Sequence, residues 1–579
     1  MNKKNITFLA MSACAMLVSS SIWADTLVLK NANVYTMDTN KPTAKNVVSV
    51  DGVITYVGNE EPTLPANEKV HSIDLNGKTV FPGFIDGHIH AAAEEMSKTT
   101  KVFLTDKKPD VQVYLDTIKD YSQKHPNLKV IQGERVQLKA FENGIPTKEL
   151  LDSVVPDRPV IIADTTNHIF WVNSKALELA GVTGKTKVPE GGKMPLNEKG
   201  EPVGILIDNA RDFIAPLIKL EPVSAEQYKN AFKAFQEKAN SLGVTSVNAI
   251  EITGNTLSIK EVWKILSEMD KDHELTLRVN MYNTLKPGFD IDKHIQQMQE
   301  SQKELSSDFL YINTFKMFAD GVAEGGTAYL VEPYPREAQL GDHYHGAPIW
   351  KKAQFNETIK KVNDAGLNVH IHAIGDGAVK ESINAIEGAL KDKPTKDPRH
   401  SITHVSLIEP IDITRMAKNN ITASIQPIWF YDDPIFAPQE RKMLGDERFK
   451  NSYPAGDMVK AGVRITGSAD APVTPDFNPL VGIETGVLRE NPYGPEPHPE
   501  TLRNQEQRVP VLDMIKAYTI NSAYQSGMDN NVGSIQKGKK ADFVVLDTDI
   551  MTAPASTISE GKVLYTIVDG KVVFQNKDK

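Results

Sequence analysis

The chain has 579 residues, of which 40% are hydrophobic and 24% are charged, and its formal net charge at pH 7 is -10. This length exceeds one ordinary hydrophobic core, so we expect a large domain and at least one smaller one. The acidic balance and the lack of a basic cluster argue against nucleic acid or an anionic membrane surface as partners. They favour a small-molecule substrate, and a homodimer remains open.

The N-terminal segment has the pattern of a secretory signal peptide. A short basic stretch and an apolar run over residues 6–18 lead to a cleavage signal that ends at Ala24. The apolar run is shorter than the roughly 20 residues that span a bilayer, so we expect no stable membrane insertion after cleavage. We therefore predict a signal peptide over residues 1–24 and export to the periplasm or the medium. Cleavage before Cys14, giving a lipoprotein, is the alternative.

Both ends of the mature chain consist of short β-type runs separated by turn residues. Such runs flank the pair Asp51-Gly52 near one end and the pair Asp569-Gly570 near the other. An Asp-Gly pair between two β-type runs is a strong hairpin signal. Because the two ends look alike and differ from the middle, we predict one composite β-sandwich domain built from residues 25–80 and 533–579.

The middle of the chain, residues 81–532, alternates apolar runs with amphipathic stretches. This alternation is typical of an α/β fold with a parallel sheet and crossover helices. We predict a (β/α)8 TIM-like barrel. Its eight strands are expected near residues 84–90, 245–251, 277–282, 312–318, 367–373, 400–406, 421–426 and 464–469.

One connection in this pattern is much longer than the others. Residues 91–240 are too many for a single crossover and contain strand-like runs of their own at 128–131 and 159–163. We interpret this block as a subdomain inserted after the first barrel strand. An insertion at that point is expected to overhang the catalytic rim of the barrel.

The first predicted barrel strand ends in a His-x-His motif, His88 and His90. A strand turns every second side chain to the same side, so both imidazoles can reach one metal ion. The carboxyl ends of barrel strands form the catalytic rim of this fold, which is where the pair lies. A lone His-x-His is more often structural than a metal site, so the interpretation depends on the later strands.

Lys316 lies in an otherwise apolar run. A charged amine would be costly there if it were buried alone. A buried lysine loses its proton easily, and the neutral amine can take up carbon dioxide to become a carbamate that bridges two metals. The alternative is a lysine that reaches solvent or pairs with Asp320.

Three further candidates stand near the ends of later strand-like runs. His372 forms a second His-x-His with His370, and we favour His372 as the ligand because it lies nearer the strand end and Gly375 permits a tight turn after it. His404 ends another run. Asp470 ends the last one, where a carboxylate can bind a metal and accept a proton. Each of these residues alone is more often structural than catalytic.

The candidate ligands are all nitrogen and oxygen donors, because the only cysteine, Cys14, lies in the predicted signal peptide. Such a set suits one or two divalent ions, zinc first, and also accepts manganese, iron or cobalt. A metal at such a site lowers the pKa of bound water from about 15.7 to about 7, which supplies hydroxide at neutral pH. No Gly-x-Ser-x-Gly motif offers a serine nucleophile. We therefore predict a metal-dependent hydrolase.

As a set, the motifs are far more specific than any one of them. They comprise residues 81–90, 171–177, 316–321, 372–376, 468–472 and 533–542. With them the sequence resembles the amidohydrolase superfamily, specifically its amidohydrolase 3 branch, which includes N-substituted formamide deformylases and exoenzyme regulatory proteins. The resemblance covers nearly all of the mature chain.

The resemblance implies a metal-bearing barrel that hydrolyses C–N bonds of amides, N-formyl or N-acyl compounds, or cyclic amides. It implies one metal bound by His88, His90 and Asp470, and a second bound by His372 and His404. In this scheme Lys316 is carboxylated and bridges the two metals.

The resemblance also implies roles in proton transfer and substrate binding. Asp470 would carry a proton from the attacking hydroxide to the leaving nitrogen. His168 and Trp171, in the inserted block, correspond to a lid that faces the substrate, and we expect them to contact it.

Two alternatives to this function remain. The first is a periplasmic binding or regulatory protein that kept the barrel but lost turnover, because a fold alone does not fix a function. The second is hydrolysis of an ester, a lactone or a phosphoester at the same metals.

Overall fold

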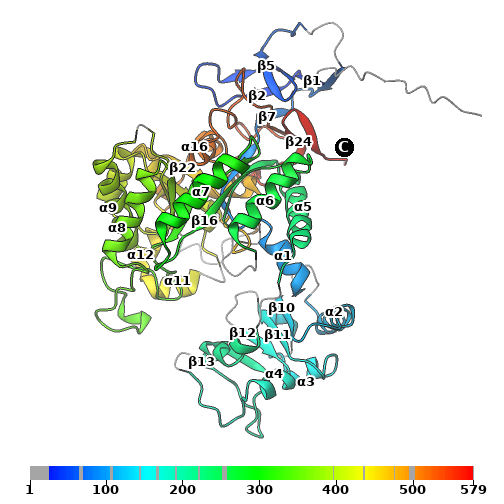
Figure 1. Ribbon diagram of the computed structural model, residues 1–579, viewed down its shortest axis with the longest axis vertical. Coiled ribbons are helices and arrows are strands. Elements are labelled where there is room, and N and C mark those ends of the chain that lie inside the picture. Colours follow the sequence, from blue (N-terminus) through cyan, green and yellow to red (C-terminus); the bar gives the residue numbers. More distant parts are fainter. Residues whose placement is uncertain are drawn as a thin grey trace, which may run out of the picture.

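The computed structural model describes residues 25–63, 69–104, 109–141, 145–164, 169–189, 192–218, 222–250, 257–395, 397–433, 437–474, 476–494 and 503–577. Three parts follow one another along the long axis (Figure 1): a β-sandwich, a barrel and a smaller subdomain. Within these ranges, no helix has the length and the apolar character that a bilayer crossing requires. The predicted signal peptide lies outside the described residues, so its cleavage stays a prediction.

The central part is a nearly closed barrel of eight parallel strands, as predicted. The strands, each paired with the next, are β8 (Phe84–Ile89), β15 (Val244–Ile250), β16 (Arg278–Thr284), β18 (Thr314–Phe318), β19 (Asn368–Ala373), β20 (Ser401–His404), β21 (Thr422–Ile425) and β22 (Ile465–Gly467). The short β17 (Leu310–Tyr311) pairs beside β16. At the seam between the last strand and the first, the His90 N–H donates to the Ala471 carbonyl at 2.9 Å.

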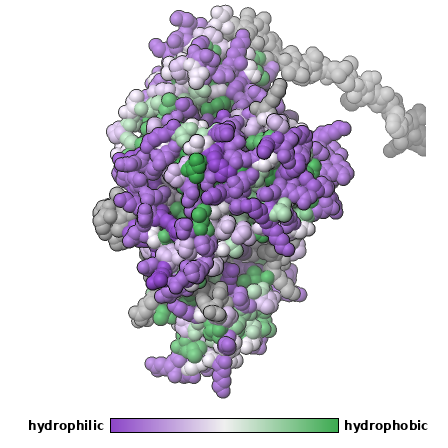
Figure 2. Space-filling model, turned by 90° about the vertical axis from the view of Figure 1, so that its left-hand side faces the viewer, coloured by the Kyte–Doolittle hydropathy of each residue, from purple (hydrophilic) through white to green (hydrophobic). Residues whose placement is uncertain are grey.

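Helices surround the barrel and bury the outer faces of its strands. The longer ones are α5 (Ala225–Ser241), α6 (Ile259–Lys271), α7 (Ile291–Leu305), α8 (Lys352–Asp364), α9 (Asp376–Asp392), α10 (Pro410–Lys418) and α14 (Pro479–Leu488). Shorter ones are α11 (Ala437–Leu444), α12 (Asp446–Lys450), α13 (Ala455–Lys460), α15 (Val511–Ala517) and α16 (Ile520–Ser526). The outward surface over α8 and α9 is mainly hydrophilic (Figure 2), as expected for helices that bury one apolar face.

Local sequence explains where these helices begin. Ser224 and Ser258 start α5 and α6, and each forms a capping box with the residue three positions later, Gln227 and Glu261. The α6 helix then buries Trp263, whose indole N–H donates to a backbone carbonyl of β16 at 3.2 Å. The main core therefore lies between the strands of the barrel and its ring of helices.

The sandwich is built from both ends of the chain, as predicted. One sheet has the order β5-β4-β1-β6 and the other β25-β24-β23-β7-β2-β3. Their strands are β1 (Asp25–Lys30), β2 (Asn33–Tyr35), β3 (Thr43–Ala44), β4 (Asn46–Val50), β5 (Val53–Gly58), β6 (Lys69–Asp74), β7 (Thr79–Pro82), β23 (Phe543–Leu546), β24 (Val563–Val568) and β25 (Lys571–Gln575). Both Asp-Gly pairs connect antiparallel neighbours, β4 to β5 and β24 to β25.

The block after β8 forms a separate subdomain around a six-stranded sheet of order β13-β14-β12-β11-β10-β9. Its elements are α1 (Ala93–Thr100), β9 (Val102–Phe103), α2 (Val111–Lys124), β10 (Ile131–Val136), α3 (Lys148–Asp152), β11 (Val160–Asp164), β12 (Ile169–Val172), α4 (Ser174–Leu179), β13 (Gly192–Lys193) and β14 (Ile205–Asp208). The subdomain lies at the opposite end of the barrel from the sandwich (Figure 1). The predicted insertion after the first barrel strand is thus confirmed.

One strand of this subdomain starts later in the chain than predicted. The strand expected at 128–131 begins only at Ile131, because the residues before it form a turn in which the Leu128 N–H donates to the His125 carbonyl at 3.3 Å.

A side chain of β10 joins the subdomain to the barrel. The Arg135 guanidinium donates to the Pro472 carbonyl at 2.8 Å. The subdomain therefore contacts the loop that follows β22, at the rim of the barrel.

A buried ion pair joins the barrel to the sandwich and permits a stability prediction. Arg278, in β16, is fully buried and donates to both carboxylate oxygens of Asp542, at 2.7 and 2.9 Å. Asp542→Asn removes the main counter-charge of this guanidinium and leaves only Asp569, 3.4 Å away, so we expect the free energy of unfolding to fall by about 3 kcal/mol in urea titrations, the low end of the range for a broken buried pair. Asp120→Asn breaks the exposed Lys124–Asp120 pair of α2, and about 0–1 kcal/mol is expected there. Equal losses in the two variants would contradict the prediction.

Candidate metal centre

The carboxyl-terminal ends of the barrel strands bring together side chains from widely separated parts of the sequence. His88 is in β8 and His90 directly follows it, whereas Asp470 lies in the loop after β22. The structure gathers all the predicted metal ligands in one connected group: His88, His90, Lys316, His372, His404 and Asp470.

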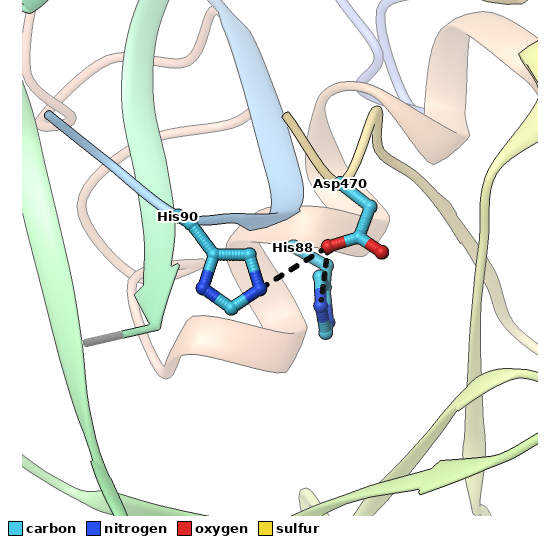
Figure 3. Close-up of side chains that lie close together, drawn as sticks. All are labelled: His88, His90 and Asp470. Atoms are coloured by element: carbon cyan, nitrogen blue, oxygen red, sulfur yellow. Dashed lines mark ion pairs between the residues drawn. The ribbon is translucent and has the colours of Figure 1, made fainter. Parts of the chain in front are cut away.

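The tightest part of this group consists of His88, His90 and Asp470 (Figure 3). One ligand atom from each residue lies within 4.8 Å of the other two. Asp470 Oδ1 is 3.1 Å from His88 Nε2 and 3.4 Å from His90 Nε2. Two imidazole nitrogens and one carboxylate oxygen around a common point are a three-ligand set for a divalent cation.

The unpaired oxygen of Asp470 faces the two imidazoles of the His-x-His motif, where a cation would bind. Asp470 Oδ1 and His90 Nδ1 are buried and have no hydrogen-bond partner among the described residues. A buried polar atom without a partner is costly, and a cation held by Asp470 Oδ1 would satisfy that oxygen. The site is therefore chemically incomplete as a purely structural cluster.

The charge of Asp470 also suits a ligand. Burial alone raises the pKa of its carboxyl group, but His90, His404 and Lys316 lower it by more, so the net shift is downward. Asp470 is therefore ionised at neutral pH. Its backbone is in the left-handed region, with φ of 56°. This conformation costs about 1 kcal/mol or more in a non-glycine residue, and such strain is commonly found at functional sites.

Lys316 is 1% exposed, so its amine does not reach solvent. Its Nζ atom lies 3.5 Å from His88 Nε2 and 4.8 Å from the centre of the Phe318 ring. Burial lowers its pKa to about 7, although Asp470 acts in the opposite direction. A substantial fraction of the amine is thus uncharged at neutral pH, the form that reacts with carbon dioxide.

Asp320, the alternative partner of Lys316, is occupied elsewhere. Its carboxylate accepts backbone N–H groups of Tyr329, Ile374 and Gly375 at 2.8–3.0 Å. These bonds tie the loop after β18 to the turn after β19. Asp320 Oδ1 also lies 3.7 Å from His372 Nε2.

His372 and His404 form the other side of the group, with ring centres 4.5 Å apart. His372 Nε2 donates to the Gly321 carbonyl at 3.0 Å, and His404 Nδ1 donates to Gln426 Oε1 at 2.9 Å. Each ring therefore keeps its second nitrogen as a free lone pair. Burial, with Lys316 second, lowers the pKa of His372 to about 4, so the ring is neutral at pH 7, as a metal ligand must be.

The two predicted substrate contacts are not part of this group. Trp171, in β12, is fully buried in the core of the inserted subdomain, where its indole N–H donates to the Thr147 carbonyl at 2.8 Å and its ring packs against Phe141. The structure therefore places Trp171 in packing rather than beside the metal ligands. His168 lies outside the described residues, so its contact with substrate stays a prediction.

Two further residues complete the surroundings of the site and had no role in the sequence analysis. Trp429, in η6 (Pro427–Trp429), stacks on His404 with ring centres 5.4 Å apart. Asp86, in β8, accepts the backbone N–H groups of His88 and Ala469 at 2.9 and 3.1 Å, and burial raises its pKa to about 8. Both carried a usable signal: Trp429 soon follows a predicted barrel strand, and Asp86 shares the two-residue period of the His-x-His motif.

A small pocket opens beside His90. Phe235, Phe477, Glu94 and Glu95 are among the residues that line it. Pro472, two residues after Asp470, also lines it. The pocket therefore lies between a predicted metal ligand and the loop that carries Asp470.

Comparison with known proteins agrees with this geometry. A model of the Amidohydrolase family matches residues 71–574. The chain is 28% identical to the putative amidohydrolase YtcJ of Bacillus subtilis (strain 168) over 551 residues, which are 94% of this chain and 98% of that protein. It is 26% identical to the N-substituted formamide deformylase of Arthrobacter pascens over 563 residues, 95% and 98% of the two chains. An uncharacterized metal-dependent hydrolase from Pyrococcus horikoshii OT3 shares the fold, with a TM-score of 0.67 and 23% identity, over 92% of this chain and 99% of that one.

Proposed function

This chain belongs to the amidohydrolase family, and we propose that it is a metal-dependent hydrolase of C–N bonds in amides, N-formyl or N-acyl compounds, or cyclic amides. One observation carries the proposal: ligand atoms of His88, His90 and Asp470 lie within 4.8 Å of one another at the catalytic end of the barrel. The relative named as a formamide deformylase, matched over 95% of this chain, supports a C–N bond as the target.

The donor atoms favour zinc. His88, His90 and Asp470 would hold one ion, and His372 with His404 would hold a second, with a carboxylated Lys316 between them. Nitrogen and oxygen donors suit zinc and also accept manganese, iron or cobalt. When bound, such an ion polarises the scissile carbonyl and lowers the pKa of water to about 7.

Asp470 is the residue that moves the proton. Its carboxylate is ionised at neutral pH, so it can accept a proton from the attacking water. The protonated carboxyl group can then return this proton to the leaving nitrogen. The nitrogen needs the proton because an amide anion is a poor leaving group. A C–N bond therefore needs a proton donor at this position more than an activated ester does.

The protein is also proposed to act outside the cytoplasm, because its first 24 residues have the pattern of a signal peptide. Its partner there would be a small molecule, since the acidic chain has no basic cluster for nucleic acid. A homodimer is compatible with this role.

Metal analysis combined with a substrate panel tests the proposed function. The purified mature chain is expected to contain at least one transition metal per chain by elemental analysis. In its zinc form it should hydrolyse N-formyl, N-acyl or cyclic amide compounds in preference to ester, lactone and phosphoester analogues. Preference for the latter group would favour the alternative hydrolase, and bound metal without turnover on any compound would favour a binding or regulatory protein. A chain that takes up no metal would refute all three.

A further inference from the structure

A second buried histidine lies directly behind the metal ligand His88. His370, in β19, is fully buried, and its Nε2 atom is 2.6 Å from His88 Nδ1. On its other side, His370 Nδ1 is 2.7 Å from the Ser401 hydroxyl oxygen. The three side chains form a line that begins at the metal ligand and runs into the barrel interior.

The positions of the protons along this line follow from the role of His88. A hydrogen bond between two imidazoles needs one N–H group and one lone pair. His88 Nε2 faces Asp470 Oδ1 at 3.1 Å and must offer its lone pair to bind a cation. The proton of neutral His88 is then on Nδ1 and is donated to His370 Nε2. His370 in turn has its proton on Nδ1 and donates it to Ser401.

The orientation of His370 is fixed by the residues packed around it. The ring of Tyr282 lies against it, with centres 5.1 Å apart. The Tyr282 hydroxyl accepts from Gln525 Nε2 at 3.2 Å, and the same amide group donates to the Gly87 carbonyl at 2.7 Å. Gly87 precedes His88 in β8, so this layer is anchored to the strand that carries the metal ligand.

No carboxylate takes the place of His370 within the described contacts of His88. A metal-binding histidine usually donates its second N–H to a carboxylate, a backbone carbonyl or water. Asp470 lies at Nε2, on the other side of the His88 ring, and Asp86 accepts the backbone N–H groups of His88 and Ala469. The acceptor for the His88 side chain is therefore an imidazole.

We propose that His370 is a positioning residue of the metal centre: it accepts the Nδ1–H of His88 and holds that ring with its Nε2 lone pair toward Asp470. The inference rests on the proposed function, because it presumes a metal at His88. His370 itself contacts neither the metal nor the substrate. Its role is to fix one tautomer and one orientation of a ligand.

Zinc affinity of the metal-free mature chain, measured by competition with a chromogenic chelator, tests this role without any substrate. His370→Leu removes the acceptor and is expected to weaken zinc binding about 10–100-fold, the range seen when such supporting groups are lost. His370→Gln can place an amide oxygen near the former Nε2 and should restore affinity to within about threefold of the wild type. His370→Asn is too short to reach His88 and should bind as weakly as the Leu variant.

His400→Leu provides the matched control. His400, like His370, is a buried histidine, but it contacts the Val369 N–H and the Asn363 side chain rather than a metal ligand. We expect the His400→Leu variant to be less stable than the wild type but to bind zinc with the same affinity.

Three results would overturn the inference. They are unchanged zinc affinity in His370→Leu, a Gln variant as weak as the Leu variant, and an equal loss in His400→Leu. If His370→Leu does not fold, the Asn and Gln variants supply the same comparison. A wild-type chain that binds no zinc would instead mark failure of the proposed function, and bound zinc without amide turnover would leave the role of His370 intact.

Discussion

Asp470→Asn is expected to lower kcat/KM for an amide substrate by about 10³-fold, within the range of 10²–10⁴ attributed to a positioned acid or base. The substituted amide has nearly the same size as the carboxylate, but it cannot take up and return a proton. The substitution also removes the anionic oxygen that lies 3.1 and 3.4 Å from the two imidazoles of the His-x-His motif. The measurement is steady-state kinetics at saturating zinc, with circular dichroism to show that the fold is kept.

Two comparisons separate the proton-transfer role of Asp470 from its role as a ligand. Substrates whose leaving group departs without protonation, such as activated esters, should lose much less activity than alkyl amides do. Asp476→Asn changes a carboxylate in the same loop that instead accepts the Tyr493 hydroxyl at 2.9 Å, and we expect it to cost less than about tenfold. Unchanged amide hydrolysis in Asp470→Asn, or an equal loss for both kinds of leaving group, would contradict the proton-transfer role.

The barrel could be predicted because each of its strands has a recognisable sequence pattern of its own. Parallel strands covered on both faces read as continuous apolar runs, and β15, which is buried along its whole length, is typical. Each such run could be found without knowing its neighbours. The rule that catalytic residues follow barrel strands then placed His88, Lys316 and Asp470 on one rim.

Contacts that depend on how the barrel closes could not be predicted in the same way. The two-residue period puts His370 and His372 on the same face of β19, and the sequence does not say which of them meets the metal. Only the arrangement of β8 beside the later strands shows that His370 lies behind His88, 282 positions away in the chain. Their distance is a property of the closed barrel and not of either strand.

The inserted subdomain shows the other limit of sequence reasoning. Trp171 belongs to a family motif, and an aromatic residue in an insertion can face either the active site or a core of its own. Here the sheet of the insertion is covered on both faces, with Trp171 on one face and Phe170 on the other, so Trp171 is needed for packing. Likewise, Leu128 is apolar but lies in a turn, so hydrophobicity alone misplaced the start of β10.

Lys316→Met is expected to make the metal-free protein more stable at neutral pH while it abolishes most of the activity. The side chains are similar in length, but methionine carries no charge that burial would penalise. Burial lowers the pKa of Lys316 to about 7, whereas an unfolded lysine has a pKa of about 10.4. At pH 7 this difference corresponds to roughly 4 kcal/mol of lost stability in the wild type, by about 1.36 kcal/mol per pKa unit. The variant also lacks the amine that would form the bridging carbamate.

The sign of the pH dependence follows from proton counting. Between the two pKa values the unfolded chain holds one more proton at this group than the folded chain, so the stability of the wild type rises with pH. The advantage of Lys316→Met should therefore shrink by about 1.4 kcal/mol per pH unit between pH 8 and 9.5. The raised pKa values of Asp86 and Asp320, about 8 and about 7, act in the opposite direction and mostly below this window. They also cancel in the difference between the two proteins.

Urea titrations of both proteins, with chelator and in buffer freed of carbon dioxide, measure this difference. Lys124→Met serves as the control, because Lys124 is 69% exposed and its loss removes no buried amine. Its stability relative to the wild type should stay level across the same pH range. A level difference for Lys316→Met would mean that the amine keeps its proton in the folded chain, and carbamate formation would then lose its basis. If the slope appears, added bicarbonate should increase zinc uptake by the wild type and leave uptake by Lys316→Met unchanged, because only the wild type has an amine to carboxylate.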